Sequence, residues 1–208
     1  MEIEPQGLAL IICAPSATGK STLIKRLTEE FPDFAFSVSY TTRPPREGER
    51  DGREYTFVDR EAFIELTEKH FFAEWAQVHS NFYGTPLRET LETLRSGRDM
   101  LFDIDVQGAR QLKENLKVGA YVFLLPPSRG ELNRRMELRD SEDEADRAQR
   151  MQQAGDELRM ADEFDYWIVN DDVDQAYAKL RCIYLAEKCR PKYNPELVSG
   201  LLQQWEHR

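Results

Sequence analysis

The clearest pattern along the chain is a set of short apolar runs of strand length. Residues 8–13 are apolar without interruption, and further largely apolar runs occur at 100–105, 121–125 and 166–169. Strands without polar alternation are typical of a parallel sheet that is covered on both faces. Segments with apolar residues at helical spacing separate the runs. The pattern therefore predicts an α/β domain with a parallel central sheet.

Several predicted helices begin at residues suited to capping. Thr85 followed by Pro86 predicts a helix with Thr85 as its N-cap and an end near Gly97. The other predicted helices span 20–27, 59–69 with Asp59 as its cap, 107–115, 128–139, a stretch from the acidic patch 140–146 to about 161, and 172–189 with Asp172 as its cap.

Residues from about 37 to 90 interrupt the alternation of strands and helices. The runs at 36–40, 55–58 and 71–83 predict short strands, and the loop 43–53 carries four arginines, two prolines and two glycines. We expect this segment to be an insertion into the larger domain.

Net charge and composition exclude several classes of function. The 208 residues include 28 basic and 38 acidic side chains, a formal net charge of −10, and 40% are hydrophobic. This balance repels nucleic-acid backbones and anionic lipid surfaces, so we expect no nucleic-acid and no membrane partner. The three cysteines lack metal-ligand or disulfide spacing, and the N-terminus lacks the features of a signal peptide. A cytoplasmic protein is expected, as a monomer or a homo-oligomer.

Residues 14–21 follow the first apolar run and precede a helical pattern. They match the phosphate-binding pattern G-x-x-x-x-G-K-[ST], except that Ala14 replaces the first glycine. Small residues let backbone N–H groups converge on phosphate oxygens, and the helix N-terminus adds its dipole. Lys20 would bring its charge to the β- and γ-phosphates, and the Ser21 hydroxyl would ligate Mg²⁺. An ordinary strand-to-helix turn is the alternative, which the strand–loop–helix context disfavours.

Two carboxylates, Asp103 and Asp105, stand at the end of the second apolar run. Ligands of open parallel sheets bind at the carboxyl edge of the strands, which would place Asp103 beside the phosphate loop. Capping of the following helix is the alternative role for such an aspartate. Beside a phosphate loop, Mg²⁺ binding is the favoured interpretation.

Inside the expected insertion, Arg43 and Arg46 lie three residues apart on a proline-stiffened loop. In a protein of net negative charge, such a pair suits bidentate capture of a phosphate, with a solvated basic loop as the alternative. Farther along, Glu74, Tyr83 and Thr85 provide a carboxylate, a phenol and a hydroxyl. Each alone is typical of surface or packing positions, but together they could satisfy a purine edge and a phosphate.

Six motifs together resemble those of the guanylate kinase family, in the family's order over about residues 8–190. They are APSATGKST (14–22), FSVSYTTRPPREGE (36–49), FAEWAQVHSNFYGT (72–85), LFDIDVQGA (101–109), LPPS (125–128) and IVNDD (168–172). The resemblance implies a single domain over residues 1–208, with a P-loop core, a small GMP-binding insert and a helical lid. The implied bounds are about 8–36, 98–134 and 165–190 for the core, 37–90 for the insert, 135–160 for the lid and 190–208 for a C-terminal tail.

The resemblance also implies roles for individual residues. Arg43, Arg46, Tyr55 and Tyr83 would hold the phosphate of GMP. Glu74 and Asp105 would accept hydrogen bonds from guanine, with Ser39 and Thr85 completing the base contacts. Residues 14–22 (Ala14, Pro15, Ser16, Ala17, Thr18, Gly19, Lys20, Ser21 and Thr22) and the lid arginine Arg135 would bind ATP. Lys20, Arg43, Arg139 and Arg150 would be catalytic, and Ser21 and Asp103 would hold Mg²⁺. Ala14 and Ala17 stand where relatives carry glycine, and Thr85 where many carry serine.

These roles imply transfer of the γ-phosphoryl group of ATP to GMP, giving ADP and GDP with Mg²⁺ as the cofactor. Two alternatives share parts of this pattern. A guanylate-kinase-like interaction module binds phosphopeptides and typically lacks a working P-loop, whereas Lys20 and Ser21 are present here. A related kinase for a ribose bisphosphate would not need the expected guanine-binding residues Ser39, Glu74 and Thr85.

Overall fold

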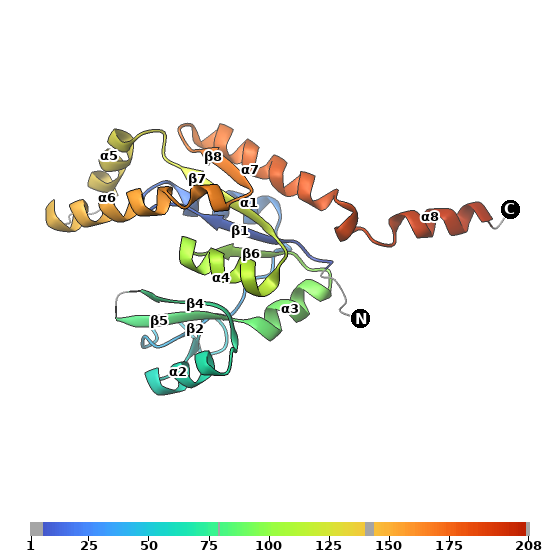
Figure 1. Ribbon diagram of the computed structural model, residues 1–208, viewed down its shortest axis with the longest axis horizontal. Coiled ribbons are helices and arrows are strands. Elements are labelled where there is room, and N and C mark those ends of the chain that lie inside the picture. Colours follow the sequence, from blue (N-terminus) through green and yellow to red (C-terminus); the bar gives the residue numbers. More distant parts are fainter. Residues whose placement is uncertain (1–5, 79, 140–143, 207–208) are drawn as a thin grey trace.

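The described residues form two four-stranded sheets, and the larger by strand length is parallel, with the order β6–β1–β7–β8 (Figure 1). The computed structural model describes residues 6–78, 80–139 and 144–206. The strands are β1 (Ala9–Cys13), β6 (Met100–Asp103), β7 (Ala120–Leu125) and β8 (Tyr166–Val169). The α/β class and the parallel central sheet that the apolar runs predict are confirmed.

Helices pack on both faces of this sheet, which explains why its inner strands lack polar alternation. Alternate residues of β1 contribute to opposite sides: Leu10 and Ile12 belong to a cluster with α1 and α7, whereas Ile11 and Cys13 belong to one with α4. The helices are α1 (Lys20–Glu30), α4 (Val106–Leu116) and α7 (Val173–Lys188).

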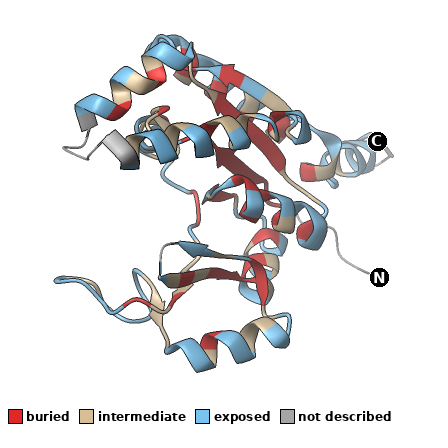
Figure 2. Ribbon diagram, turned by 60° about the vertical axis from the view of Figure 1, so that its left-hand side comes forward, coloured by how far each residue is buried: buried red, intermediate tan, exposed pale blue. Residues whose placement is uncertain are grey.

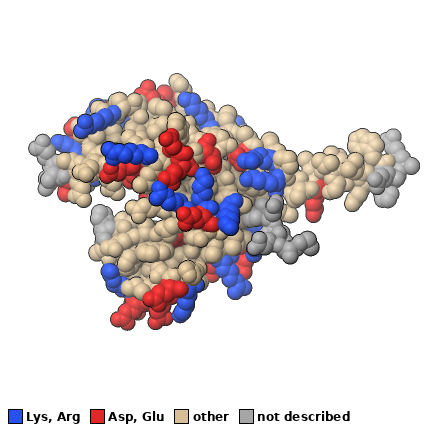
Figure 3. Space-filling view, in the orientation of Figure 1, with Lys and Arg blue, Asp and Glu red and all other residues tan. Residues whose placement is uncertain are grey.

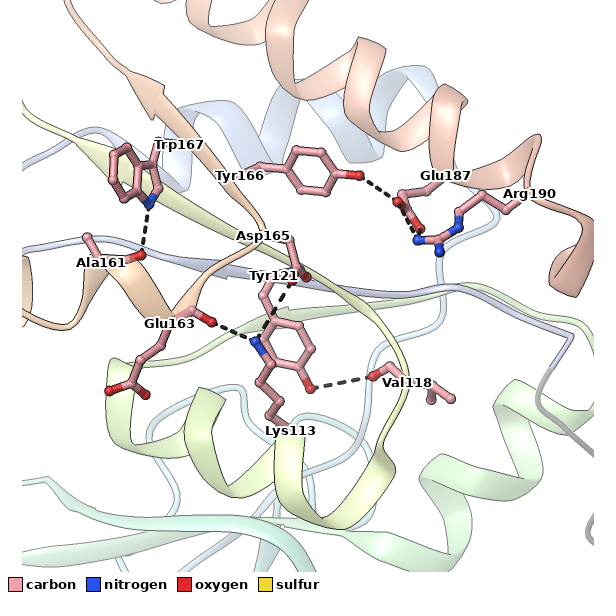
Figure 4. A network of polar contacts seen from close by, with 10 residues as sticks. All are labelled: Lys113, Val118, Tyr121, Ala161, Glu163, Asp165, Tyr166, Trp167, Glu187 and Arg190. Carbon is pink, nitrogen blue, oxygen red and sulfur yellow. Dashed lines mark hydrogen bonds and ion pairs between the residues drawn. The ribbon is translucent and has the colours of Figure 1, made fainter.

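The edge strand β8 is held by a polar network with α7 (Figure 4). Glu187 is only 3% exposed, and its carboxylate accepts a hydrogen bond from the Tyr166 hydroxyl at 2.6 Å. Nη1 of Arg190 donates to both oxygens of the same carboxylate, at 3.1 and 3.2 Å. These partners offset the cost of burying the charge. The network fixes the strand that Asn170 follows.

A second sheet, in the order β3–β2–β5–β4, forms a separate layer in the segment expected to be an insertion (Figure 2). Phe63 stacks on Phe72 and Phe82, with ring centroids 4.6 and 5.4 Å apart, and so packs α2 against this sheet. The elements are β2 (Tyr40–Thr41), β3 (Thr56–Phe57), α2 (Arg60–Glu68), β4 (Phe72–Val78), β5 (Asn81–Pro86) and α3 (Leu87–Arg95).

The predicted strand at 36–40 is wrong except at its last residue. Ala35 bridges to Met100 in the larger sheet, whereas Tyr40 pairs with Gly84 in the smaller one. Residues 36–39 therefore cross between the two sheets outside any strand, and Ser39 is joined to the smaller sheet by its carbonyl, which accepts from the Thr56 N–H at 2.9 Å.

The predicted N-cap at Thr85 is also wrong. Thr85 lies within β5, Pro86 occupies the N-cap, and α3 begins at Leu87. The Thr85 hydroxyl donates instead to Glu74 on the neighbouring strand β4. The caps at Asp59 and Asp172 are confirmed, because their carboxylates accept from the backbone N–H groups of Ala62 and Gln175.

The helices α5 (Arg129–Arg139) and α6 (Glu144–Leu158) contact the loop after β1. Their shared cluster contains Leu132, Met136 and Ala154, and Ala17 packs against it. Of the acidic patch 140–146, residues 140–143 lie outside the described residues. The chain continues through short turns of 3₁₀ helix, η1 (Ala161–Glu163) and η2 (Pro191–Tyr193).

The last helix, α8 (Leu197–Glu206), extends away from the body of the molecule (Figure 1). Its apolar side chains Leu202 and Trp205 are exposed. Among the described helices, none combines the length and the apolar character that a membrane crossing requires.

Candidate active site

The loop between β1 and α1 lines a cavity of about 660 Å³ at the carboxyl end of the larger sheet. Gly19 caps α1 with φ +97°, a conformation that favours glycine. Ala17 also has a positive φ of 63°, which costs a non-glycine residue about 1–2 kcal/mol. Its methyl group contacts the cluster of α5 and α6, a contact that glycine would not make. The lining residues are Ala14, Pro15, Ser16, Ala17, Thr18, Gly19, Lys20, Ser21, Thr22, Asp103, Arg135 and Glu157.

Lys20 and Asp103 meet at the floor of this cavity. Lys20 Nζ lies 2.6 Å from Oδ1 of Asp103 and donates to the carbonyl of Ile104 at 3.2 Å. The parallel register pairs Ile12 of β1 with Asp103 of β6. Asp103 therefore lies at the carboxyl edge beside the phosphate loop, where its position along the sequence predicts it.

Asn170 is a residue of this site that the sequence analysis missed. Its Nδ2 donates to the carbonyl of Thr18 at 2.7 Å, and the residue is 4% exposed. Arg135 adds Nη1 contacts to the carbonyls of Asn170 at 3.0 Å and Thr18 at 3.5 Å, while its Nε donates to Glu131. A Cβ on Gly19 would lie 2.5 Å from Asn170 Nδ2, so the two residues fit closely. The family motif at 168–172 contains Asn170 and so pointed to this segment, but no local sequence pattern predicts that Asn170 contacts Thr18.

Helix α6 brings two further side chains to the cavity. Arg150 Nη2 donates to the Ser16 hydroxyl at 2.7 Å, which places this predicted lid arginine on the phosphate loop. Glu157, which the sequence analysis also missed, lines the same cavity. Burial and, to a lesser degree, the charge of Asp105 raise the pKa of Glu157 to about 7. Arg139 ends α5, and the position of its side chain lies outside what the structure describes.

A second cavity of about 410 Å³ lies between the two sheets. Glu74 on β4 is 7% exposed, and its Oε1 accepts from the Thr85 hydroxyl at 2.5 Å. Burial raises the pKa of Glu74 to about 7; the Thr85 hydrogen bond lowers it, and the charge of Asp105 raises it. The predicted site residues that line this cavity are Lys20, Ser39, Tyr55, Glu74, Tyr83, Thr85, Asp103 and Asp105.

Asp105 has two structural roles, as a helix cap and as a cavity-lining residue. Its Oδ1 caps α4 by accepting from the N–H of Gly108 at 2.8 Å, and the residue also lines the second cavity. A Cβ on Gly108 would lie 2.9 Å from Oε2 of Glu74. Glycine therefore allows the first turn of α4 to approach the Glu74 carboxylate closely.

Arg43 lies beside the aromatic side chains at the rim of the second cavity. Its guanidinium is 5.0 Å from the ring of Tyr55, and a hydrogen bond to Glu49, with a smaller contribution from Tyr83, raises its pKa. The side chain of Arg46 is exposed, and its backbone N–H donates to Glu49. The structure therefore brings Arg43, Tyr55 and Tyr83 together, whereas Arg46 is linked to them through the loop.

Lys20 and Arg135 supply positive charge to the first cavity. On the face shown in Figure 3, Lys and Arg side chains are interspersed with Asp and Glu. Among the described residues, no group of three or more His, Cys, Asp or Glu side chains could hold a metal ion by itself.

The site has the features of a P-loop kinase with an acceptor site. These features are a phosphate-binding loop on a parallel sheet, a buried carboxylate in an added small sheet and arginines on flanking helices.

The guanylate kinase family profile matches residues 6–187. The guanylate kinase of Nitratidesulfovibrio vulgaris is 57% identical over 97% of this chain and 98% of its own length. That of Oleidesulfovibrio alaskensis is 59% identical over 96% and 97%. The crystal structure of guanylate kinase from Anaplasma phagocytophilum aligns with a TM-score of 0.69 and 31% identity, covering 91% of this chain and 90% of that one.

The chain belongs to the guanylate kinase family, whose members phosphorylate GMP with ATP to give GDP. Family membership confirms the kinase activity that the six sequence motifs imply. The individual residue roles and the lid and insert boundaries remain predictions.

Proposed function

We propose that this chain transfers the γ-phosphoryl group of ATP in line to the phosphate of GMP, with ATP in the cavity of the phosphate loop and GMP in the cavity between the sheets. The observation that carries this proposal is that both cavities are lined by Lys20 and Asp103. Two nucleotides bound there would meet at this pair, as direct transfer between them requires.

On the donor side, residues 14–19 would bind phosphate oxygens through their backbone N–H groups, at the N-terminus of α1. Lys20 would exchange its contact with Asp103 for one with the β- and γ-phosphates. Arg135 and Arg150 contact Thr18 and Ser16 of the loop, which supports a role in which their charges would neutralise the phosphates bound there. Arg139 is assigned the same role by the family resemblance.

The residues present fit Mg²⁺, the proposed cofactor. Its preferred ligands are oxygens, and the Ser21 hydroxyl and the Asp103 carboxylate both line the donor cavity. These two side chains would hold the ion together with the phosphates. When bound, it would neutralise charge on the transferring phosphoryl group.

On the acceptor side, guanine offers hydrogen-bond donors at N1 and at the 2-amino group. Glu74 and Asp105 supply acceptors in the same cavity, and Ser39 and Thr85 add hydroxyl groups. Arg43, Arg46, Tyr55 and Tyr83 would hold the phosphate. A purine without these donors would leave the buried Glu74 carboxylate unpaired, which costs about 1–3 kcal/mol or more for a charged group.

No protein nucleophile is needed, because an oxygen of the GMP phosphate attacks the γ-phosphorus directly. Catalysis is then positioning together with charge neutralisation by Lys20 and the arginines. Movement of α5 and α6 over the bound nucleotides would exclude water, which would otherwise hydrolyse ATP.

A coupled assay of ADP release with GMP, IMP, AMP and a ribose bisphosphate as acceptors tests this proposal. We expect strong release with GMP, weaker release with IMP and little with AMP. A preference for the ribose bisphosphate would favour the related kinase, and an absence of release with every acceptor would favour a binding module.

A further inference from the structure

Glu49 is a loop carboxylate that pairs with Arg43 through two parallel hydrogen bonds. Nη1 of Arg43 lies 2.6 Å from Oε2 of Glu49, and Nη2 lies 2.7 Å from Oε1. The side chains are only 10% and 18% exposed. Two bonds of this kind set both the position and the plane of the guanidinium.

A count of the donors shows what this pairing leaves available. A guanidinium has five N–H groups. Nη1 uses both of its hydrogens, on the carbonyl of Pro44 at 2.9 Å and on Glu49, and Nη2 uses one. Tyr83 is a further hydrogen-bond partner of this side chain, and the donors that the contacts to Pro44 and Glu49 leave over are Nε and the second hydrogen of Nη2. These two point the same way along one edge.

That remaining edge has the shape needed for an oxyanion. Elsewhere in this chain, Arg110 uses the same two atoms, Nε and Nη2, to bind both oxygens of Glu163. The matching pair on Arg43 suits two phosphate oxygens equally well. The Tyr55 ring, 5.0 Å from the guanidinium, and the Phe57 ring, 5.7 Å away, flank the same side chain.

The same carboxylate also shapes the loop that carries the second arginine. Oε2 of Glu49 accepts from the backbone N–H of Arg46 at 2.7 Å. One side chain therefore orients Arg43 and holds the backbone from which Arg46 projects.

We propose that Glu49 is a positioning residue: it occupies one edge of Arg43 and thereby presents the other edge to the phosphate of GMP. The inference rests on the proposed function, in which Arg43 binds that phosphate. Loss of Glu49 would have two opposing effects, a more positive site and an arginine free to rotate. Orientation dominates, because the phosphate does not need the edge that Glu49 occupies and a flexible arginine must be ordered on each binding event.

The test compares Glu49→Gln with Glu47→Gln, which removes one charge from an exposed position of the same loop. The dissociation constants of GMP, of guanosine and of ATP are measured by titration calorimetry. Guanosine carries the base without the phosphate. We expect Glu49→Gln to weaken GMP about tenfold or more and to leave guanosine and ATP unchanged, as misorientation of a binding group does. Glu47→Gln should change none of the three.

Two further variants make the result decisive. Glu49→Asp keeps the charge but is one methylene shorter, so it should weaken GMP to an intermediate degree. Adding Glu49→Gln to Arg43→Ala should weaken GMP binding much less than Glu49→Gln does alone, because the orienting effect on Arg43 is then already lost and only the contact with the Arg46 backbone remains to be removed.

The other outcomes overturn the inference. Tighter GMP binding by Glu49→Gln would show that the carboxylate competes with the phosphate, and equal losses for GMP and guanosine would show a purely structural role. If Arg43→Ala weakens GMP but Glu49→Gln does not, the inference fails and the proposed function stands. If Arg43→Ala leaves GMP binding unchanged, the proposed role of Arg43 fails, and the inference fails with it.

Discussion

The ammonium group of Lys20 lies 2.6 Å from the carboxylate of Asp103, and both residues line the cavity of the phosphate loop as well as the cavity between the sheets. The side chains are 21% and 46% exposed, so the pair stabilises the fold only weakly. A weak pair suits a lysine that must exchange a carboxylate for phosphate oxygens when a nucleotide binds.

Replacement of Lys20 by alanine should abolish phosphoryl transfer and leave the fold intact. The side chain lines both cavities, and its polar contacts within the described part of the chain are the ion pair with Asp103 and the hydrogen bond to the Ile104 carbonyl. Steady-state turnover together with the melting temperature checks this expectation. Near-normal turnover in Lys20→Ala would contradict the proposed mechanism.

Replacement of Asn170 by alanine should weaken the binding of ATP more than the binding of GMP. The change removes the 2.7 Å hydrogen bond to the Thr18 carbonyl and leaves a buried backbone acceptor poorly satisfied. Such a loss costs about 1–3 kcal/mol, which corresponds to a roughly 5- to 150-fold rise in the KM for ATP if the loop must be restored for binding. Asp171→Asn, at the exposed neighbouring position, is the control. Parallel rises in both KM values would indicate a general loss of structure.

Replacement of Arg46 by alanine should raise the KM for GMP at least tenfold, as loss of a charge-assisted hydrogen bond to phosphate does, without altering ATP binding. The side chain is exposed on the loop of the insert, away from the residues that line the donor cavity. Arg50→Ala removes an equal charge from another exposed position of the same loop and should have little effect. An equal weakening of both nucleotides would assign Arg46 to the ATP side.

Replacement of Glu74 by glutamine should reduce the preference for GMP over AMP. The carboxylate can only accept, which suits guanine, whereas an amide can also donate to the N1 of adenine. A site built for a hydrogen-bonding group can reject its absence by roughly 10⁴-fold in kcat/KM, and the variant should narrow this ratio. Unchanged selectivity would show that Glu74 does not contact the base.

The protonation of Glu74 should couple GMP binding to pH. The pKa of Glu74 in the folded chain is raised to about 7. At a pH between the ordinary pKa of a glutamate and about 7, the folded chain therefore keeps this carboxyl group protonated, whereas the unfolded chain loses the proton. The contribution of Glu74 to folding stability therefore falls as pH rises through this window. GMP, which donates to the charged form, should release up to one proton on binding at pH 6.

The proton release is measured by calorimetric titration of GMP at pH 6 in buffers of different ionisation enthalpy. The affinity for GMP should rise from pH 5 to 7, and Glu74→Gln should release fewer protons. Glu157, whose pKa is also raised to about 7, lines the cavity of the phosphate loop. Any proton that Glu157 exchanges should be the same in the wild-type chain and in Glu74→Gln, so the difference between the two proteins reports on Glu74. Proton uptake by the wild-type chain would contradict the expected sign.

Much of the fold follows from local sequence patterns. The run at 8–13 predicts a strand covered on both faces because its side chains are apolar on both sides of the strand. This property can be recognised within the run itself. Residues 14–21 predict the phosphate loop because small residues, a lysine and a helix start are adjacent in the chain. Asp59 and Asp172 predict helix caps for the same reason, since a cap bonds to a backbone group three residues away.

Tertiary structure decided the features that depend on distant partners. Thr85 has the local pattern of a cap, but its hydroxyl donates a hydrogen bond to the buried Glu74 on the neighbouring strand. Residues 36–39 alternate as a strand would, yet they cross between the two sheets and belong to a strand of neither. Asn170 reaches Thr18 across 152 positions of the sequence, and no local periodicity encodes a contact of that range. The sequence by itself determined the strands of the larger sheet, because each run is apolar enough to require burial, and it determined the loop at 14–21 and the caps at Asp59 and Asp172, because those patterns lie within a few residues. Which side chains share a cavity was decided only when the sheet brought its strand ends together.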